Sequence, residues 1–208
     1  MKRFVPCLIL MAAVLTLLPA PAARAQDSRP IQLSLVPSVQ LFDRSTDVAG
    51  LRLAIVGENR NVTGIDVGFG LLTKGDFAGV SWGLVNLVDG STQGLQWSLV
   101  NYTKGDVAGL QWGWYNQAGP MVGIQWGIAN VAGGEFTGWQ AGGLNLDQSG
   151  LTHGFCLGLV NVTDQMKGFQ LGLVNVTNSM VSGLQIGIVN IIKDKEKLPV
   201  LPLVNWRF

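Results

Sequence analysis

The chain is poor in the residues that carry most catalytic and metal chemistry. Its 208 residues include one histidine, two cysteines and two tyrosines. Cys7 falls in an N-terminal segment that we expect to be removed, so only Cys156 is left and an intrachain disulfide is excluded. His153 has no second histidine or thiolate cluster with which to form a metal site. We therefore expect no metal, no cofactor and no enzyme activity.

Clusters of basic residues and long apolar runs are also missing. Lysine and arginine total 14 and aspartate and glutamate 13, without the basic patch that a nucleic-acid surface requires. After residue 25 no stretch of 18 apolar residues occurs, which excludes a membrane-spanning helix from that part of the sequence. Any membrane role must therefore come from strands.

The N-terminus has the three parts of a secretory signal peptide. Lys2 and Arg3 precede an apolar run, residues 4–18, and Ala23-Arg24-Ala25 supplies a small-x-small cleavage site. Prolines at positions 19 and 21 end the apolar run too early for a membrane anchor. We predict that residues 1–25 are a signal peptide and that residues 26–208 form a single β-repeat domain.

One phrase, Gly-apolar-Gln-apolar-Gly-apolar-Val-Asn, returns about every 15 residues over residues 50–190. The clearest copies are Gly94–Asn101, Gly109–Asn116, Gly123–Asn130, Gly168–Asn175 and Gly183–Asn190. Weaker copies begin at Gly50, Gly64, Gly79, Gly138 and Gly154. A repeat this short predicts one structural element used about ten times.

Each repeat is predicted to be a strand, because apolar residues alternate with small or polar ones and polar turn residues separate the copies. The turn sequence Thr73–Gly79 returns 30 residues later at Thr103–Gly109, while the intervening turns differ. Unlike turns at the two ends are typical of an antiparallel meander, whereas a parallel solenoid would make every turn equivalent. With Ile31–Phe42 and a C-terminal strand at Leu198–Phe208, the prediction is all-β: an up-and-down antiparallel meander of about 12 strands, closed as a transmembrane β-barrel.

Strict alternation places the repeat on two faces. One face carries leucine, isoleucine and tryptophan, with the repeated asparagines near its margin. The other carries a polar row in which Arg52 and Asp66 are placed for a cross-strand ion pair. That row consists of Arg52, Asp66, Gln96, Gln111, Gln125, Gln140, Gln170 and Gln185. We interpret it as a face in water or in a hydrated lumen, and the apolar face as one that lipid covers.

The chain resembles bacterial outer-membrane β-barrels in three features: its predicted signal peptide, its alternating pattern and its last residues, Val204–Phe208. Terminal Trp206 and Phe208 are similar to the signal that the barrel-assembly machinery reads in that superfamily. The repeats resemble those of uncharacterised bacterial "surface repeat" envelope proteins. This resemblance implies outer-membrane lipid and the assembly machinery as partners, and export to the outer membrane or cell surface.

Two functional hypotheses remain open from the sequence. The first is an outer-membrane barrel with a structural or weakly pore-like role. The second is a secreted or periplasmic β-repeat protein whose apolar face packs in a sandwich or on a partner. The glutamine row could bind a sugar or pass a small polar solute, but a self-satisfying amide ladder between strands is favoured. The sequence does not indicate an oligomeric state.

Overall fold

The structure is a computed structural model that describes residues 28–208, so the predicted signal peptide, residues 1–25, lies outside the described residues. Within them every regular element is a strand. The strands are β1 (Ser28–Val36), β2 (Val39–Gln40), β3 (Asp47–Asn59), β4 (Val62–Thr73), β5 (Phe77–Val88), β6 (Thr92–Thr103), β7 (Val107–Trp112), β8 (Tyr115–Ala118), β9 (Met121–Ala132), β10 (Phe136–Asp147), β11 (Leu151–Leu171), β12 (Val174–Ile192) and β13 (Val200–Arg207).

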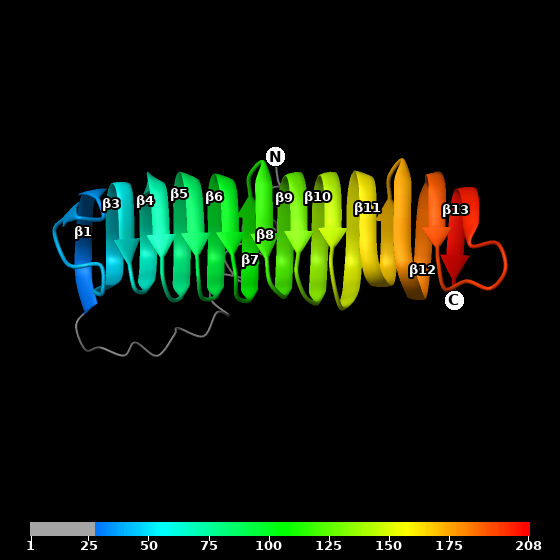
Figure 1. The fold of residues 1–208 in the computed structure, drawn as a ribbon, viewed down its shortest axis with the longest axis horizontal. Coiled ribbons are helices and arrows are strands. Elements are labelled where there is room, and N and C mark those ends of the chain that lie inside the picture. The colour runs from blue at the N-terminus through cyan, green and yellow to red at the C-terminus, as the bar shows by residue number, and fades with distance from the viewer. Residues whose placement is uncertain (1–27) are drawn as a thin grey trace, which may run out of the picture.

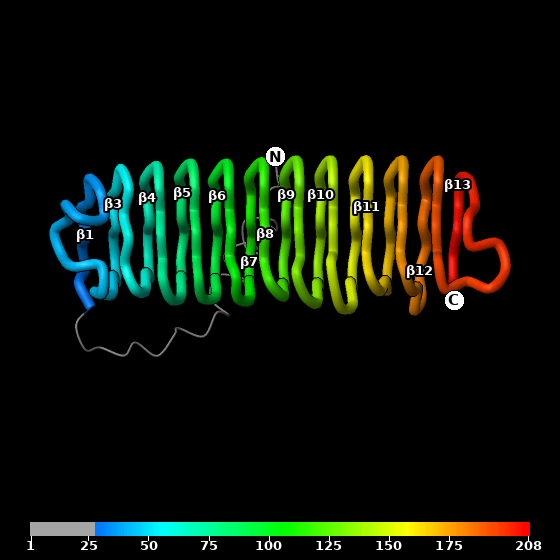
Figure 2. The backbone as a smooth tube through the Cα atoms, viewed as in Figure 1, coloured from blue at the N-terminus to red at the C-terminus, as the bar shows by residue number. Residues whose placement is uncertain are grey.

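The strands stack as a parallel solenoid, and the predicted antiparallel meander and β-barrel are wrong. From β3 to β12 all neighbours pair in parallel, with each repeat glycine beside the next one, as Gly64 is beside Gly79 and Gly79 beside Gly94. The chain therefore forms a rod in which each repeat is one coil (Figures 1 and 2). Neighbouring coils are about 4.8 Å apart, as in any sheet.

Each coil must fold back on itself in the middle of its strand. β5 and β6 start in register although only three residues separate them. A straight strand of 12 residues would span about 40 Å, which three residues cannot retrace. The strand therefore bends where the second glycine of the phrase lies, for example at Gly83. The coil has two edges, a turn edge and a bend edge. The bend lies inside most strands, but it separates β7 from β8 and β11 from β12, where β11 and β12 continue through the turn.

The bend changes which residues face inward. In β5 the buried positions are Phe77 and Ser81 before the bend and Asn86 and Val88 after it, so the alternation shifts by one residue. The sequence analysis assumed that inward- and outward-facing residues alternate without interruption along the whole strand. That assumption places the asparagines on the apolar face. The asparagines are instead buried in the interior.

The turns alternate in sequence because stacked turns need alternating charge. Lys74, Asp89 and Lys104 lie in three successive turns on the same edge, with ion pairs of 3.3 Å from Lys74 to Asp89 and 2.5 Å from Lys104 to Asp89. Like charges directly opposite on neighbouring strands are destabilising. The 30-residue period therefore reflects charge pairing between adjacent coils, and it does not separate two ends of a meander.

The repeat glycines hold a backbone conformation that other residues rarely adopt. Gly109, at φ 144°, has no room for a Cβ, which would lie far inside contact distance of the Gly94 carbonyl oxygen. The same holds along the column: Gly50, Gly64, Gly79, Gly94, Gly109, Gly123, Gly138, Gly154, Gly168 and Gly183 all have φ between 118° and 154°. The first glycine of the phrase is therefore required by the stacking.

Both ends of the rod are closed by antiparallel strands. β13 runs antiparallel to β12, and the two-residue β2 runs antiparallel to β1. The side-chain amides of Gln32 and Gln40 both donate hydrogen bonds to the carbonyl oxygen of Phe42 and so fix the loop after β2. An antiparallel edge does not offer the parallel register of the repeats, so the rod is not extended by another copy in the same way.

We predict that Gly109→Ala lowers the free energy of unfolding by at least about 2 kcal/mol, because alanine at this φ is strained and its Cβ meets the Gly94 carbonyl. Gly133→Ala is the matched control. Its Cβ would lie 3.5 Å from the nearest atom, and the change should stay within about 0.5 kcal/mol. Denaturant unfolding followed by circular dichroism measures both. Equal effects would contradict the assigned backbone strain.

Candidate functional site

The glutamines of the repeat form a ladder through the interior. Gln111 donates from Nε2 to Oε1 of Gln96 at 2.9 Å, and Gln125 donates in the same way to Gln111 at 2.8 Å. Gln140 continues the chain to Gln125 at 2.9 Å, and Gln185 donates to Gln170 at 2.7 Å. All are fully buried. The geometry is that of an amide ladder, and the glutamines lie neither in water nor along a lumen.

The asparagines form a second ladder, nearer the bend edge. Asn101 donates from Nδ2 to Oδ1 of Asn116 at 2.8 Å and to the carbonyl of Trp112 at 3.0 Å. The ladder repeats without a break through the buried residues Asn101, Asn116, Asn130, Asn145, Asn161, Asn175 and Asn190. Each amide also satisfies a carbonyl beside a bend, which explains why asparagine occupies this position.

At the N-terminal end the expected ion pair between Arg52 and Asp66 is present. Arg52 Nε donates to Oδ1 at 2.7 Å and Nη2 to Oδ2 at 2.6 Å, a two-point contact between two fully buried side chains. Arg52 also donates to the carbonyl of Leu72 at 2.9 Å. Both charges belong to the interior column of the glutamines. The interpretation from the sequence that this row faces water or a hydrated lumen is therefore wrong.

Ser81 interrupts the glutamine column and disturbs the coil after it. Its hydroxyl accepts from the amide of Asn86, which diverts that amide from the asparagine ladder. Among the described residues, buried atoms without a hydrogen-bond partner include Asn86 Oδ1, Gln96 Nε2, Ser98 Oγ and Asn101 Oδ1, all in β5 and β6. Ser81 accounts for two of these atoms, since it offers Gln96 no amide oxygen and draws the Asn86 amide away from Asn101. Asn86 Oδ1 has no donor because Leu71 is its neighbour in the preceding coil.

Asp147 and Cys156 are the two buried titratable groups toward the C-terminal half. Burial raises the pKa of Asp147 to about 6, against hydrogen bonds from Thr152 (2.5 Å) and Gln140 (2.7 Å) that lower it. Burial, and then the charge of Asp147, raise the pKa of the Cys156 thiol well above its usual value. The thiol is protonated and enclosed, and its hydrogen bond to Gln140 at 3.7 Å replaces one rung of the ladder.

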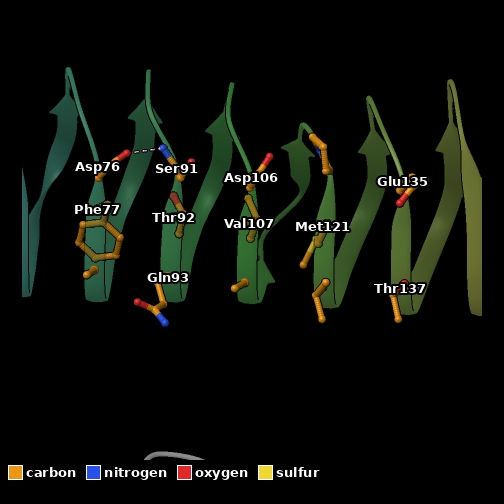
Figure 3. A pocket seen from close by; sticks show the side chains of 14 residues that line it. Asp76, Phe77, Ser91, Thr92, Gln93, Asp106, Val107, Met121, Glu135 and Thr137 are labelled. Carbon is orange, nitrogen blue, oxygen red and sulfur yellow. Dashed lines mark hydrogen bonds between the residues drawn. The ribbon is translucent and has the colours of Figure 1, made fainter. Parts of the chain in front are cut away.

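The turn edge carries a shallow groove with acidic side chains (Figure 3). Asp76, Asp106 and Glu135 lie along it on alternate coils. Asp76 accepts from the backbone N–H of Ser91 at 2.8 Å, so its carboxylate stabilises a turn. Among residues 28–208 no group of His, Cys, Asp and Glu could hold a metal ion. His153 lies at the strand entrance beside Thr137 and has an exposed side chain.

The outer surface of the coils is apolar on the bend edge and on both adjoining sides. One row lies along the bend, with exposed fractions from 40 to 64%, and we name it the bend row: Ile55, Phe69, Leu84, Leu99, Trp114, Ile128, Leu159, Leu173 and Ile188. Beside it lies the tryptophan row: Trp82, Trp97, Trp112 and Trp126. The opposite side exposes Val85, Leu87 and Leu144.

Charged residues are segregated from this surface. Within the ten eight-residue phrases only Arg52 and Asp66 are charged, and both are buried. The charges of the turn edge include Arg60, Lys74, Asp76, Asp89, Lys104, Asp106, Glu135, Asp164, Lys193 and Asp194. The cross-section of the rod is therefore charged mainly on the turn edge and largely apolar on the other three sides. Glu58, in the same column as Leu72 and Leu87, places one partly exposed charge on the opposite side at the N-terminal end.

The tryptophan row presents ring edges to the outside. Trp97 stacks on Trp112 with centroids 5.0 Å apart and planes 5° apart, and Trp112 stacks on Trp126 at 5.6 Å and 15°. Because stacked rings occupy each other's faces, the row offers no free face to a sugar ring. Phe155 and Phe169 stack similarly at 5.0 Å in the neighbouring row.

The C-terminal residues differ from their expected placement. Alignment of the last strand on the repeats puts Trp206 and Phe208 on the glutamine face. In the structure Asn205 lies beside Gln185 and is buried, while Trp206 lies beside Leu184 and is half-exposed, with Lys195 Nζ 5.2 Å from its ring. Phe208 is 92% exposed.

No family model, curated protein or solved structure matches the chain. Over residues 28–208 the structure contains no helix that is long and apolar enough to cross a membrane.

Asp147 makes stability depend on pH. Its folded pKa of about 6 exceeds the ordinary value of 3.8, so the fold binds the proton more tightly than the unfolded chain. The contribution of Asp147 to stability is fully present below about pH 4, is lost as pH rises through about 6, and amounts to roughly 3 kcal/mol. Asp147→Asn should remove this loss, whereas Asp106→Asn, at an exposed turn, should keep it. Denaturant midpoints from pH 3.5 to 8 test this, and identical profiles for the two variants would contradict it.

Ser81→Gln should extend both ladders by one coil and raise the free energy of unfolding by about 1–3 kcal/mol. The new amide can accept from Gln96 Nε2 and free Asn86 to donate to Asn101. Ser91→Gln, in a turn, is the control and should have little effect. Thermal unfolding compares the two, and a destabilised Ser81→Gln variant would show that the column does not accept glutamine at this coil.

Proposed function

We propose that the protein is a non-enzymatic, exported structural protein that acts by packing its apolar exterior against apolar surroundings. The observation that carries this proposal is the distribution of charge: the ten stacked phrases expose no charged side chain, and their only charged residues, Arg52 and Asp66, are buried. Export rests on the predicted signal peptide. We do not propose a pore, because that hypothesis depended on the predicted barrel. The interior of the rod is filled by the buried amide ladders.

The extent of the apolar surface supports an interface. The bend row covers ten coils, or about 43 Å at 4.8 Å per step. Soluble monomers rarely expose a continuous apolar patch above a few hundred Å². The buried titratable groups support a structural role rather than catalysis, since Cys156 is enclosed and Asp147 is bonded to Thr152 and Gln140.

We expect the purified protein to require detergent or an apolar partner to stay dispersed, because the exposed rows associate in water. Sedimentation velocity after detergent removal measures this. A stable, monodisperse monomer in plain buffer would reject the proposed function.

The role of single side chains can be separated from folding. Phe69 is 61% exposed and Phe77 is 1% exposed. Phe69→Ser should leave the unfolding free energy nearly unchanged and reduce association in water. Phe77→Ser should cost about 3–5 kcal/mol, because it removes a buried ring from the interior. Unfolding in detergent and sedimentation without it give the two readouts; an equal loss of stability in both variants would contradict the outward placement of Phe69.

A further inference from the structure

We propose that the surface that covers the rod is a single lipid leaflet, with the bend row deepest in the acyl region and the turn edge in water. This inference rests on the proposed function and names its partner. Three features of the rod carry it: the number of apolar sides, their height and the place of the charges.

The apolar exterior has too many sides for one protein partner. One flat side is about 43 Å long and about 17 Å wide, taking ten coils and five residues per strand segment. That is near the 800 Å² per partner of a standard interface. A second copy packed on the tryptophan row would leave the bend row and the opposite side, with Val85 and Leu87, in water. Lipid chains contact all three sides at once.

The height of the apolar band matches one leaflet. From Val80, the first exposed apolar residue after its repeat glycine, to Leu84 on the bend row there are four residue steps, or about 13 Å. The hydrocarbon of one leaflet is about 15 Å thick, half of a bilayer core. The rod is therefore tall enough to enter one leaflet, and the turn edge stays above it.

The backbone is compatible with this position. Each coil between β3 and β12 is paired on both sides, so its N–H and C=O groups are satisfied within the rod. Asn101 and its equivalents satisfy carbonyls at the bends, at the deepest point. At the turn edge, Lys74, Asp89 and Lys104 carry both signs, so binding does not require a charged headgroup.

The test uses site-specific labels on the full chain. Ile128→Cys places a thiol on the bend row and Asp106→Cys one on the turn edge, and a polarity-sensitive fluorophore is attached to each. Cys156 is fully buried with a raised pKa, so it stays unlabelled in the folded protein. The probes are phosphatidylcholine vesicles that carry nitroxides near the headgroup or deep in the acyl chain.

We expect the Ile128→Cys label to be quenched at least threefold more by the deep nitroxide than by the shallow one, and the Asp106→Cys label to show no preference for the deep one. A double variant, Leu99→Lys with Ile128→Lys, should lower vesicle partitioning at least tenfold without loss of fold. Asp106→Lys is its control. Partitioning should be the same with anionic vesicles and at high salt.

The outcomes separate the two proposals. A defined oligomer in plain buffer that shields the Ile128→Cys label and does not float with vesicles overturns the lipid inference and leaves the proposed function. A soluble monomer that does not float overturns both. Equal quenching depth for the two labels, or unchanged partitioning of the lysine double variant, overturns the assigned orientation.

Discussion

Every other feature of this protein depends on the in-register stacking of equivalent residues at about 4.8 Å. At that spacing a side chain meets its own copy above and below. Amides can repeat, because each donates to the next, and the ladders of Gln111 and Asn116 do so. Charges cannot repeat unless their sign alternates, as at Asp89. A buried carboxylate without a cation, such as Asp147, is accommodated with a raised pKa.

The stacking also reverses the usual sorting of residues. Most folds bury apolar side chains and expose amides. Here the middle of the interior is mainly amide, and the apolar clusters around Phe77, Phe136 and Met166 lie mainly at its turn side. The rows of leucine and tryptophan are outside. Cooperative hydrogen bonding therefore takes much of the role that apolar packing has in other cores.

The sequence was enough to predict strands, the 15-residue period, an ordered amide ladder and the pairing of Arg52 with Asp66. The 30-residue hairpin that the turns indicated as the physical unit is wrong, because each 15-residue phrase forms one coil. It did not reveal the bend, because the corner at Gly83 carries no polar turn residue and the period-two pattern runs through it almost unchanged. Because the bend was not predicted, Asn86 was assigned to the outward-facing positions of the strand, although its side chain is buried. The alternation of Lys74 and Asp89 was then attributed to two ends of a meander, although both lie on one edge.

The two ladders run in opposite directions. The asparagine rungs donate toward the C-terminal coil, as Asn101 does to Asn116, whereas the glutamine rungs donate toward the N-terminal one, as Gln111 does to Gln96. Their side-chain dipoles are therefore antiparallel along the rod and cancel over most of its length. A rod with a single ladder would carry opposite partial charges at its two ends, and these would be costly in surroundings of low dielectric constant. The paired ladders leave the ends nearly neutral, however many coils are stacked.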